Sequence, residues 1–298
     1  MKKVIILHQD LEYSEKKLCS ALRKSRVNTK LVDVREDLSW IDSSMLVLNR
    51  VYASVANRNY GDILLTLKKI KELEDRGVRV INDSNASFYD YSKFDASKIQ
   101  KSKGILTPET FLVNNLEQMK NIMNSILNYP VILKRNCGGR AVDVKLVKGE
   151  THLEQVWSGF ENYGGNFILQ EFVNSLDDFD YRVTCFNGKV LYCYTRSLLQ
   201  EDSSFKWLAS VSKGSERKIV QIDDELKNFV LKATEAIGAD FNSLDIVRTD
   251  KGYCVIENNL TPNFSDANSF EKKLSESLLD SLTKSIISSH LKTKVGEK

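Results

Sequence analysis

SLDIVRTDKGYCVIENN, residues 243–259, is the stretch that decides the fold of this chain. Two largely apolar runs flank Asp250-Lys251-Gly252, which is typical of an antiparallel hairpin. Residues two apart on a strand face the same way, so Glu257 and Asn259 project together. With Asp245 on the partner strand, three hard oxygen ligands would lie close together and suit Mg²⁺ bound jointly with substrate phosphates. A hairpin with a polar, solvated face explains the same spacing, although Asp and Asn are poor strand formers.

Upstream, VILKRNCGGRAVD (residues 131–143) places Lys134 at the end of another apolar strand. Gly138 and Gly139 follow it, and glycines let backbone N–H groups approach an anion closely. The common P-loop has the opposite order, with glycines before the lysine. By itself this pattern fits a plain hairpin better than a phosphate site. Cys137 has no histidine near it in the sequence, so a catalytic cysteine is disfavoured.

Two further stretches carry weak signals. In NFILQEFVNSLDDFDYR (residues 166–182), an apolar strand could present backbone groups to the edge of a base while Asp180 binds ribose hydroxyls. A strand followed by a solvated acidic loop explains this stretch more simply. Lys93, in DYSKFDASKIQKSKG (residues 90–104), is in isolation one of several surface lysines.

Composition and charge exclude several classes of protein. The chain has 298 residues, of which 42% are hydrophobic and 28% charged, as in ordinary globular proteins. Its formal charge is only +3 and the charges are interleaved, so we expect neither nucleic-acid nor membrane binding. The five scattered cysteines form no zinc motif, and neither a signal peptide nor a run of about 18 apolar residues is present. These features predict a cytoplasmic protein with reduced thiols.

The order of predicted elements indicates the fold class. Strands alternate with helices over the first 90 residues, which favours a small parallel α/β sheet. A polar loop over residues 82–94 and a short helix ending near Gly104 come next. Paired strands then predict antiparallel α+β sheets, and a final helix is expected at about residues 270–290. The predicted N-terminal elements are strands at 2–7, 28–34, 44–49 and 78–81 and helices at 12–24 and 62–76.

Taken in chain order, these weak signals resemble the ATP-grasp superfamily. Within this superfamily, the chain looks most similar to the RimK-like ligases, because Asp180 follows the QEFV segment at a short distance and the hairpin ends in VIENN. Such ligases join glutamate or other amino acids to peptides, carrier proteins or small metabolites. The resemblance runs from residue 2 to Pro262 and is carried by Lys93 eleven residues before Gly104, Lys134, QEFV with Asp180, Asp245, and Glu257-x-Asn259.

The resemblance implies an ATP-grasp fold in three parts. Residues 1–92 would form an N-terminal α/β domain, residues 93–169 a central lid subdomain, and residues 170–298 a C-terminal subdomain with the metal site. It also implies that residues 136–141 form a flexible lid over the triphosphate.

The resemblance further assigns roles to single residues. Lys93, Lys134 and the lid glycines Gly138 and Gly139 would contact the phosphates, and Lys134 would also lie near the adenine. The adenine hinge would be Gln170, Glu171, Phe172 and Val173, with backbone groups of Glu171 and Val173 reading the base. Asp180 would contact the nucleotide, and Asp245, Glu257 and Asn259 would bind Mg²⁺.

The implied reaction is ATP-dependent amide formation between a carboxylate and an amine through an acyl phosphate. We expect one or two Mg²⁺ ions, with Mn²⁺ as a substitute, and an amino acid, peptide or carrier protein as acceptor. Arg182 and Arg196 would stabilise the acyl phosphate or the oxyanion, although exposed strand arginines explain them equally well. An ATP-dependent phosphotransferase and a nucleotide-binding regulatory protein remain alternatives. A homo-oligomer, dimer or tetramer, is expected.

The sequence departs from the family pattern on the substrate side. The segment KWLASVSKG (residues 206–214) lacks the usual Arg-x-Asn element, so a phosphate contact is lost or moves to Lys206 or Lys213. Leu260 to Asn263 replace Pro-x-Pro-Gly, and Arg140 stands where a neutral residue is frequent. In the loop 49–61, Arg50 and Arg58 could hold a substrate carboxylate or be ordinary surface arginines.

Overall fold

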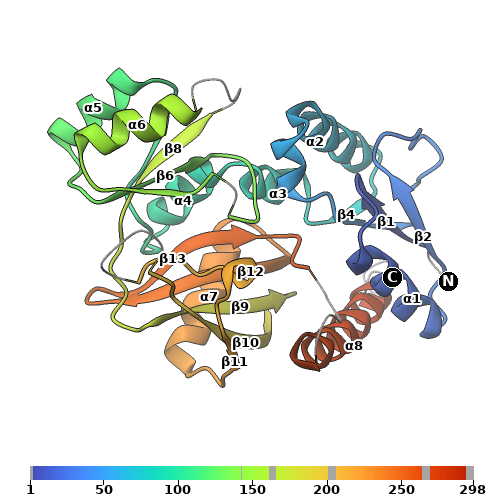
Figure 1. Cartoon of the computed structure of the whole chain (residues 1–298). Coiled ribbons are helices and arrows are strands. Elements are labelled where there is room, and N and C mark those ends of the chain that lie inside the picture. The colour runs from blue at the N-terminus through green and yellow to red at the C-terminus, as the bar shows by residue number, and fades with distance from the viewer. Residues whose placement is uncertain (1–2, 142, 161–165, 201–205, 264–268, 293–298) are drawn as a thin grey trace.

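The computed structural model describes residues 3–141, 143–160, 166–200, 206–263 and 269–292. In this part of the chain, three β-sheets follow one another along the sequence, with four, four and five strands. Figure 1 shows the N-terminal sheet on the right, the second sheet at the upper left and the five-stranded sheet below it. The expected α/β part followed by α+β parts is confirmed.

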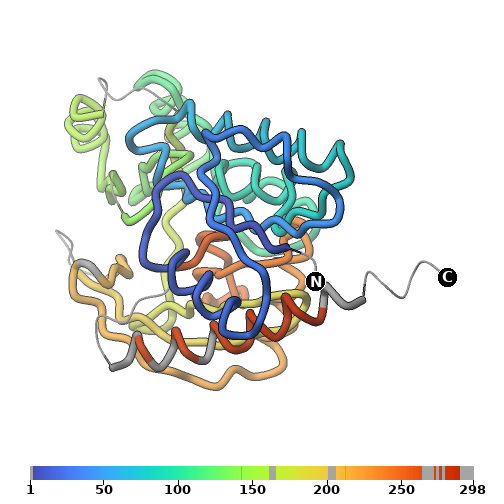
Figure 2. The backbone as a smooth tube through the Cα atoms, turned by 90° about the vertical axis from the view of Figure 1, so that its right-hand side faces the viewer, coloured from blue at the N-terminus to red at the C-terminus, as the bar shows by residue number. Residues whose placement is uncertain are grey.

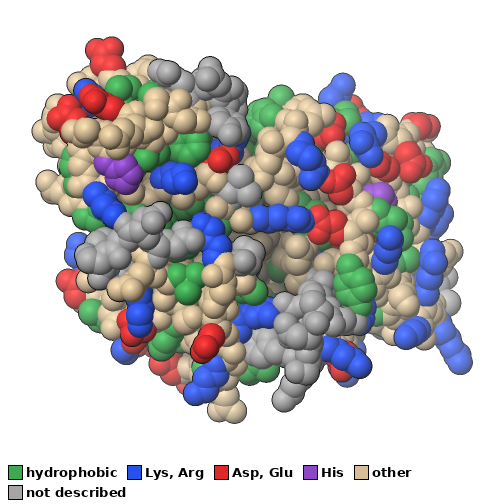
Figure 3. All heavy atoms as spheres, in the orientation of Figure 1, with side chains coloured by type: hydrophobic (Ala, Val, Ile, Leu, Met, Phe, Trp, Pro, Cys, Tyr) green, Lys and Arg blue, Asp and Glu red, His purple; other side chains and the backbone are tan. Residues whose placement is uncertain are grey.

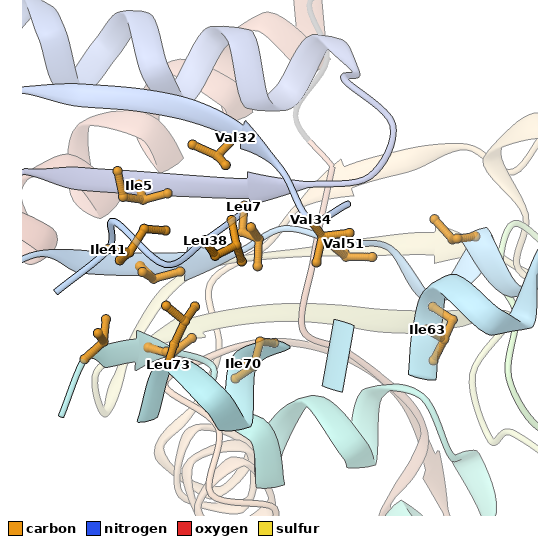
Figure 4. Close-up of a cluster of buried hydrophobic side chains, with 14 of the residues drawn as sticks. Ile5, Leu7, Val32, Val34, Leu38, Ile41, Val51, Ile63, Ile70 and Leu73 are labelled. Carbon is orange, nitrogen blue, oxygen red and sulfur yellow. The ribbon is translucent and has the colours of Figure 1, made fainter. Parts of the chain in front are cut away.

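The N-terminal sheet is parallel throughout, with the strand order β2-β1-β3-β4. Side chains alternate along its central strand β1, so Ile5 and Leu7 pack with helix α2, and Val4 and Ile6 pack with helix α1. Figure 4 shows the first of these clusters, with Ile5 and Leu7 labelled. Both faces are therefore covered, which explains why β1 is buried at every residue. The elements are β1 (Val4–His8), α1 (Tyr13–Lys24), β2 (Thr29–Asp33), β3 (Leu46–Asn49), the 3₁₀ helix η1 (Ala53–Asn57), α2 (Tyr60–Asp75) and β4 (Arg79–Ile81).

The prediction of a polar loop at residues 82–94 is wrong. This segment contains α3 (Ser84–Asp90) and the start of α4 (Lys93–Ser102). Asp83 and Ser92 are the N-caps, and each accepts a hydrogen bond from a backbone N–H three residues later. The polar residues that suggested a loop are thus helix caps, and a helix as short as α3 shows little apolar periodicity.

The second sheet is antiparallel and has the order β5-β8-β6-β7. The predicted hairpin around residues 136–141 is confirmed, since β6 pairs with β7. Helices α5 and α6, which the sequence analysis did not identify, pack on this sheet through Met119, Leu153 and Trp157. The elements are β5 (Thr110–Val113), α5 (Leu116–Ser125), β6 (Val131–Arg135), β7 (Lys145–Val147), α6 (Glu150–Phe160) and β8 (Phe167–Glu171).

The five-stranded sheet is antiparallel and has the order β11-β10-β9-β12-β13. Asn187 and Gly188 join β9 to β10 with positive φ angles of 47° and 70°, as the Asn-Gly turn predicts. Helix α7 covers one face of the sheet. The elements are β9 (Phe179–Phe186), β10 (Lys189–Ser197), the 3₁₀ helix η2 (Val211–Lys213), β11 (Arg217–Ile219), α7 (Asp224–Ala236), β12 (Phe241–Thr249) and β13 (Gly252–Asn259).

The C-terminal helix α8 (Ser269–Lys292) returns to the N-terminal sheet. Leu279, Leu282 and Ile286 are buried in one cluster with Val4 and Ile6 of β1. Figure 2 shows this helix, in red, beside the blue N-terminal segments. Strand β1 and helix α8 thereby stabilise each other. Neither α8 nor any other described helix is long and apolar enough to cross a membrane.

Candidate active site

A cavity of about 540 Å³ is lined by residues of the second and five-stranded sheets and of their loops, and by residues at η1 and α3 from the N-terminal part. This volume is in the usual range for a small-molecule site. Figure 3 shows Lys and Arg side chains along the recess between the upper-left part of the molecule and the part below it. Of the residues predicted to bind the nucleotide or the metal or to act in catalysis, all except Lys213 line the cavity: Lys93, Lys134, Gly138, Gly139, Gln170, Glu171, Phe172, Val173, Asp180, Arg182, Arg196, Asp245, Glu257 and Asn259.

Two lysines from different elements reach the same wall. Lys93 begins α4, and its Nζ lies 2.8 Å from the carbonyl oxygen of Gly138 and 3.3 Å from Oε1 of Glu257. Lys134 on β6 is buried, and this burial lowers its pKa to about 8, while Glu257 acts in the opposite direction. Because a second anion would restore the charged form, the site is suited to a phosphate group.

The hairpin predicted at residues 243–259 is present and carries the three predicted oxygen ligands. Asp245 on β12 lies directly opposite Glu257 on β13, and Asn259 follows two residues later. The side chain of Asn258, which lies between Glu257 and Asn259 on β13, exchanges hydrogen bonds of 3.0 and 3.1 Å with Gln100 of α4. This contact fixes Glu257 beside Lys93, because it ties their two elements together.

The donor set fits Mg²⁺, which binds through one or two carboxylates and completes its coordination with water and phosphate. Asp245 and Glu257 supply carboxylates and Asn259 an amide oxygen, which also accepts a 3.1 Å hydrogen bond from the Thr261 N–H. Within the described ranges, no three His, Cys, Asp or Glu side chains lie together as a metal-binding group.

Two arginines join the carboxylates of β9 and β12. Arg182 donates to both carboxylate oxygens of Asp245, at 2.6 and 2.7 Å. Arg196 on β10 contacts Asp245 at 2.8 Å and also pairs with Asp180, to which its Nε donates at 2.9 Å. Both predicted catalytic arginines therefore lie in the cavity, and the interpretation as exposed strand arginines is wrong, because Arg196 is buried and Arg182 is partly buried.

The predicted hinge lies at the end of β8. Gln170 is buried and donates to Thr110 Oγ1 at 2.9 Å. The backbone N–H of Glu171 donates to the Glu109 carbonyl, and the Glu171 side chain accepts from the Glu109 N–H. Any contact between the Glu171 backbone and a base must therefore use its carbonyl oxygen. Phe172 and Val173 continue along the cavity wall.

The predicted lid loop, residues 136–141, lies against η1 of the N-terminal part. A Cβ atom at Gly138 would meet Asn57 Oδ1 at 2.6 Å, and the φ of Gly138 is +151°. Arg140, whose role the sequence left open, pairs with Glu12 at the start of α1. Burial raises the pKa of the Cys137 thiol to about 12, which agrees with a packing role.

The two lysines that could replace the missing Arg-x-Asn element lie in different places. Lys206 and the following residues to Val211 line the cavity, but Lys213 is exposed and lies outside its lining. Lys206 is therefore the better placed of the two alternatives for a phosphate contact. Its Nζ is 2.7 Å from Asp178 Oδ2, so this contact would have to be exchanged.

The proposed carboxylate-binding role of Arg50 is wrong. Its side chain is 1% exposed, lies outside the cavity lining and pairs with Glu15 at 3.2 Å. It also donates to the Pro262 carbonyl at 2.9 Å, so it joins the N-terminal core to the segment after β13. Arg58 pairs with Asp10 at the surface. The alternative of an ordinary surface arginine is thus confirmed for Arg58 and wrong for Arg50, because loop sequence does not reveal burial.

Several cavity residues were missed. They include Tyr194 on β10 and Asp90 at the end of α3, whereas Tyr52 and Ser54 belong to the loop 49–61, where a substrate contact was expected. No motif marks them, since each is brought to the site by packing between distant segments. An acidic residue at the C-terminal end of a short helix is the only local anomaly, because the helix dipole disfavours it there.

Comparison with known proteins agrees with this geometry. "Probable alpha-L-glutamate ligase" of Methanococcoides burtonii is 24% identical over 227 residues, which cover 76% of this chain and 71% of that protein. The protein with the same description in Cellvibrio japonicus is 23% identical over 276 residues, covering 88% of each chain.

Solved structures share the fold at low identity. A RimK domain ATP-grasp protein from Sphaerobacter thermophilus has a TM-score of 0.69 and 17% identity, covering 95% of this chain and 98% of its own. D-alanine–D-alanine ligase from Bacillus anthracis has a TM-score of 0.68 and 15% identity, with both chains fully covered. The ATP-grasp ligase PsnB, complexed with a minimal precursor, has a TM-score of 0.66 and 17% identity over 97% and 99% of the two chains.

A family model for the RimK-like ATP-grasp domain matches residues 91–286. This range includes both lysines, the hinge, the two arginines and the hairpin of β12 and β13. Because the match spans most of the chain and all of these site elements, the chain belongs to the RimK-like ATP-grasp family.

Proposed function

We propose that this ligase attaches an amino acid such as glutamate to the carboxylate of a peptide or carrier protein. The broader class follows from the family: the chain is an ATP-dependent carboxylate–amine ligase. Glutamate is suggested by the relatives described as alpha-L-glutamate ligases. A peptide substrate is suggested by PsnB, whose structures include a precursor peptide.

One observation carries the proposal. Lys93, Lys134, Asp245 and Glu257, which come from four elements, converge on one cavity that the hinge residues also line. Two ammonium groups opposite two carboxylates suit a triphosphate bound with Mg²⁺, because each charge type meets its partner. The first step of the reaction requires no nucleophilic side chain, since phosphoryl transfer depends mainly on alignment and charge neutralisation.

In the first proposed step, a substrate carboxylate oxygen attacks the γ-phosphorus of ATP, and the bond to the β-phosphate oxygen breaks to release ADP. Lys93 and Lys134 would hold the phosphates and reduce the charge that develops on them. Bound Mg²⁺, one or two ions at Asp245, Glu257 and Asn259, would neutralise phosphate charge; we expect Mn²⁺ to substitute.

In the second proposed step, the amine attacks the acyl carbon, loses a proton and displaces phosphate, which leaves an amide. Arg182 and Arg196, which line the cavity, would stabilise the oxyanion of this step. The lid loop, residues 136–141, would exclude water, because an acyl phosphate otherwise hydrolyses.

An ADP-release screen across amino acids and peptides, with mass spectrometry of the products, tests the proposal. An amide whose mass equals the sum of both substrates minus water is expected, formed in equal amount with ADP. A phosphorylated product would instead identify a phosphotransferase. Nucleotide-dependent stabilisation without ADP release would identify a regulatory nucleotide-binding protein.

We propose the division into residues 1–92, 93–169 and 170–298, a cytoplasmic location and a homo-oligomer, a dimer or tetramer. Size-exclusion chromatography with light scattering tests the oligomer.

A further inference from the structure

Asp90 is a buried carboxyl group on the wall that the N-terminal part contributes to the cavity. It ends α3 and is 5% exposed. Its Oδ1 accepts a hydrogen bond of 2.8 Å from the backbone N–H of Leu260. Its Oδ2 is buried and has no hydrogen-bond partner among the residues that the structure describes. A buried carboxylate oxygen without a hydrogen bond lowers the stability of the protein. A hydrogen-bond donor on a bound ligand would remove this loss.

The surroundings of Asp90 disfavour its ionised form when no ligand is bound. The carbonyl groups at the C-terminal end of α3 disfavour a negative charge there. Burial raises the pKa of Asp90 to about 7, although the Leu260 N–H and the charge of Lys93 act in the opposite direction. A cationic ligand beside Oδ2 would stabilise the carboxylate and satisfy the free oxygen.

Strand β13 gives the position of Asp90 relative to the nucleotide residues. About halfway along it, Val255 donates to the Leu106 carbonyl, three residues before Glu109, which is hydrogen-bonded to the hinge residue Glu171. Glu257 contacts Lys93 further along, and Leu260, just beyond the strand, contacts Asp90. From Val255 to Leu260 the chain spans roughly 16 Å at about 3.3 Å per residue. Asp90 therefore lies beyond the phosphate residues, on the side opposite the hinge.

The amine must approach from this side, because the acyl group forms on the γ-phosphate and ADP occupies the hinge side. A substrate carboxylate would be repelled by Asp90, whereas an ammonium or amine N–H is attracted. We infer that Asp90 Oδ2 accepts a hydrogen bond from the amine nitrogen of the second substrate and orients it toward the acyl carbon. This inference rests on the proposed ligase function and makes Asp90 a substrate-binding residue.

The decisive variant is Asp90→Asn. Asn keeps an oxygen for the Leu260 N–H but replaces Oδ2 with an NH₂ group, which repels an amine donor. The KM for the amine, measured with L-glutamate or the amino acid that the wild type prefers, is expected to rise at least about tenfold, as for a lost hydrogen bond to a charged group. The KM for ATP is expected to stay within about twofold.

A partial reaction separates binding of the amine from the first step. Excess hydroxylamine replaces the amine and traps the acyl phosphate as a hydroxamate. Asp90→Asn is expected to form hydroxamate at the wild-type rate, which also shows that the variant is folded. Asp83→Asn on the same helix is the matched control, since Asn caps a helix as well as Asp does, and it should change neither KM.

An unchanged KM for the amine in Asp90→Asn overturns the inference. A loss of hydroxamate formation, or a raised Mg²⁺ requirement, also overturns it, because Asp90 would then serve the metal or the phosphates. Should Asp90→Asn not fold, the smaller Asp90→Ser variant must show the same amine-specific loss. Absence of hydroxamate and ADP with the wild type rejects the proposed function itself, and this inference with it.

Discussion

Arg182 on β9 holds Asp245 on β12 through two hydrogen bonds, of 2.6 Å from Nε and 2.7 Å from Nη2. Burial alone would raise the pKa of Asp245, but the guanidinium groups of Arg182 and Arg196 outweigh it and hold the pKa at about 2. The proposed metal ligand is thus also the partner of both proposed catalytic arginines. One side chain would therefore couple the proposed metal site to the proposed oxyanion site.

Replacing Asp245 with Asn is expected to lower the free energy of unfolding by about 3 kcal/mol at pH 7, because the partly buried guanidinium of Arg182 loses its paired carboxylate and Arg196 keeps only Asp180. The pKa of Asp245 is about 2 in the folded protein and about 3.9 in the unfolded chain. Its contribution is therefore complete above about pH 4 and is lost as the pH falls toward 2.

Urea unfolding of the wild type and Asp245→Asn in EDTA, at pH 7, 4 and 3, measures this contribution. The difference between the two proteins should shrink between pH 4 and pH 3, and a constant difference would contradict the assignment. Asp178→Asn is the control, because it removes an exposed pair with Lys206 that contributes less than about 1 kcal/mol.

Lys134→Ala is expected to reduce ATP-dependent ADP release by at least about a hundredfold, as when one preorganised donor to the transition state is removed. Lys134 is buried in the cavity, whereas Lys145 on the neighbouring strand β7 is exposed. Lys145→Ala is therefore the matched control and should retain full activity. Circular dichroism must show an intact fold in both variants. A Lys134→Ala enzyme with a near-normal rate would exclude this lysine from the phosphate site.

Glu257→Gln is expected to raise the Mg²⁺ concentration for half-maximal activity at least about tenfold, because a carboxylate ligand becomes a neutral amide. The change also removes the charge that pairs with Lys93 at 3.3 Å. Mg²⁺ titrations of ADP release with Glu257→Gln and with Lys93→Ala separate these two effects. An unchanged Mg²⁺ dependence in Glu257→Gln removes the residue from the metal site.

Arg140→Ala is expected to uncouple ADP release from amide formation, because the ion pair with Glu12 that holds the lid against the N-terminal part is lost. More acyl phosphate would then hydrolyse, so the amide formed per ADP should fall about twofold or more, in line with the modest energy of an exposed pair. The charge exchange Arg140→Glu with Glu12→Arg should restore part of the coupling. Equal coupling in Arg140→Ala and wild type would show that the pair does not hold the lid closed.

The sequence by itself determined the elements whose information is local. The hairpin of residues 243–259 and the parallel N-terminal sheet were predicted, because strand alternation and turn residues depend on neighbours in the chain. The cavity residues from Lys93 to Asn259 were found from their order and spacing, together with the family resemblance. Helices α5, α6 and α7 were not identified, and α3 was read as a loop because its polar residues cap helices.

Only the tertiary structure decided the partners of charged side chains. Arg50 and Arg182 are both arginines near strand ends or in strands, yet one is in the core with Glu15 and the other is in the cavity with Asp245. Asp90 meets Leu260 across 170 residues of sequence, and Arg140 meets Glu12 across 128. Local sequence patterns do not specify such contacts, because the energy of a charge depends on its burial and on the groups that packing brings beside it.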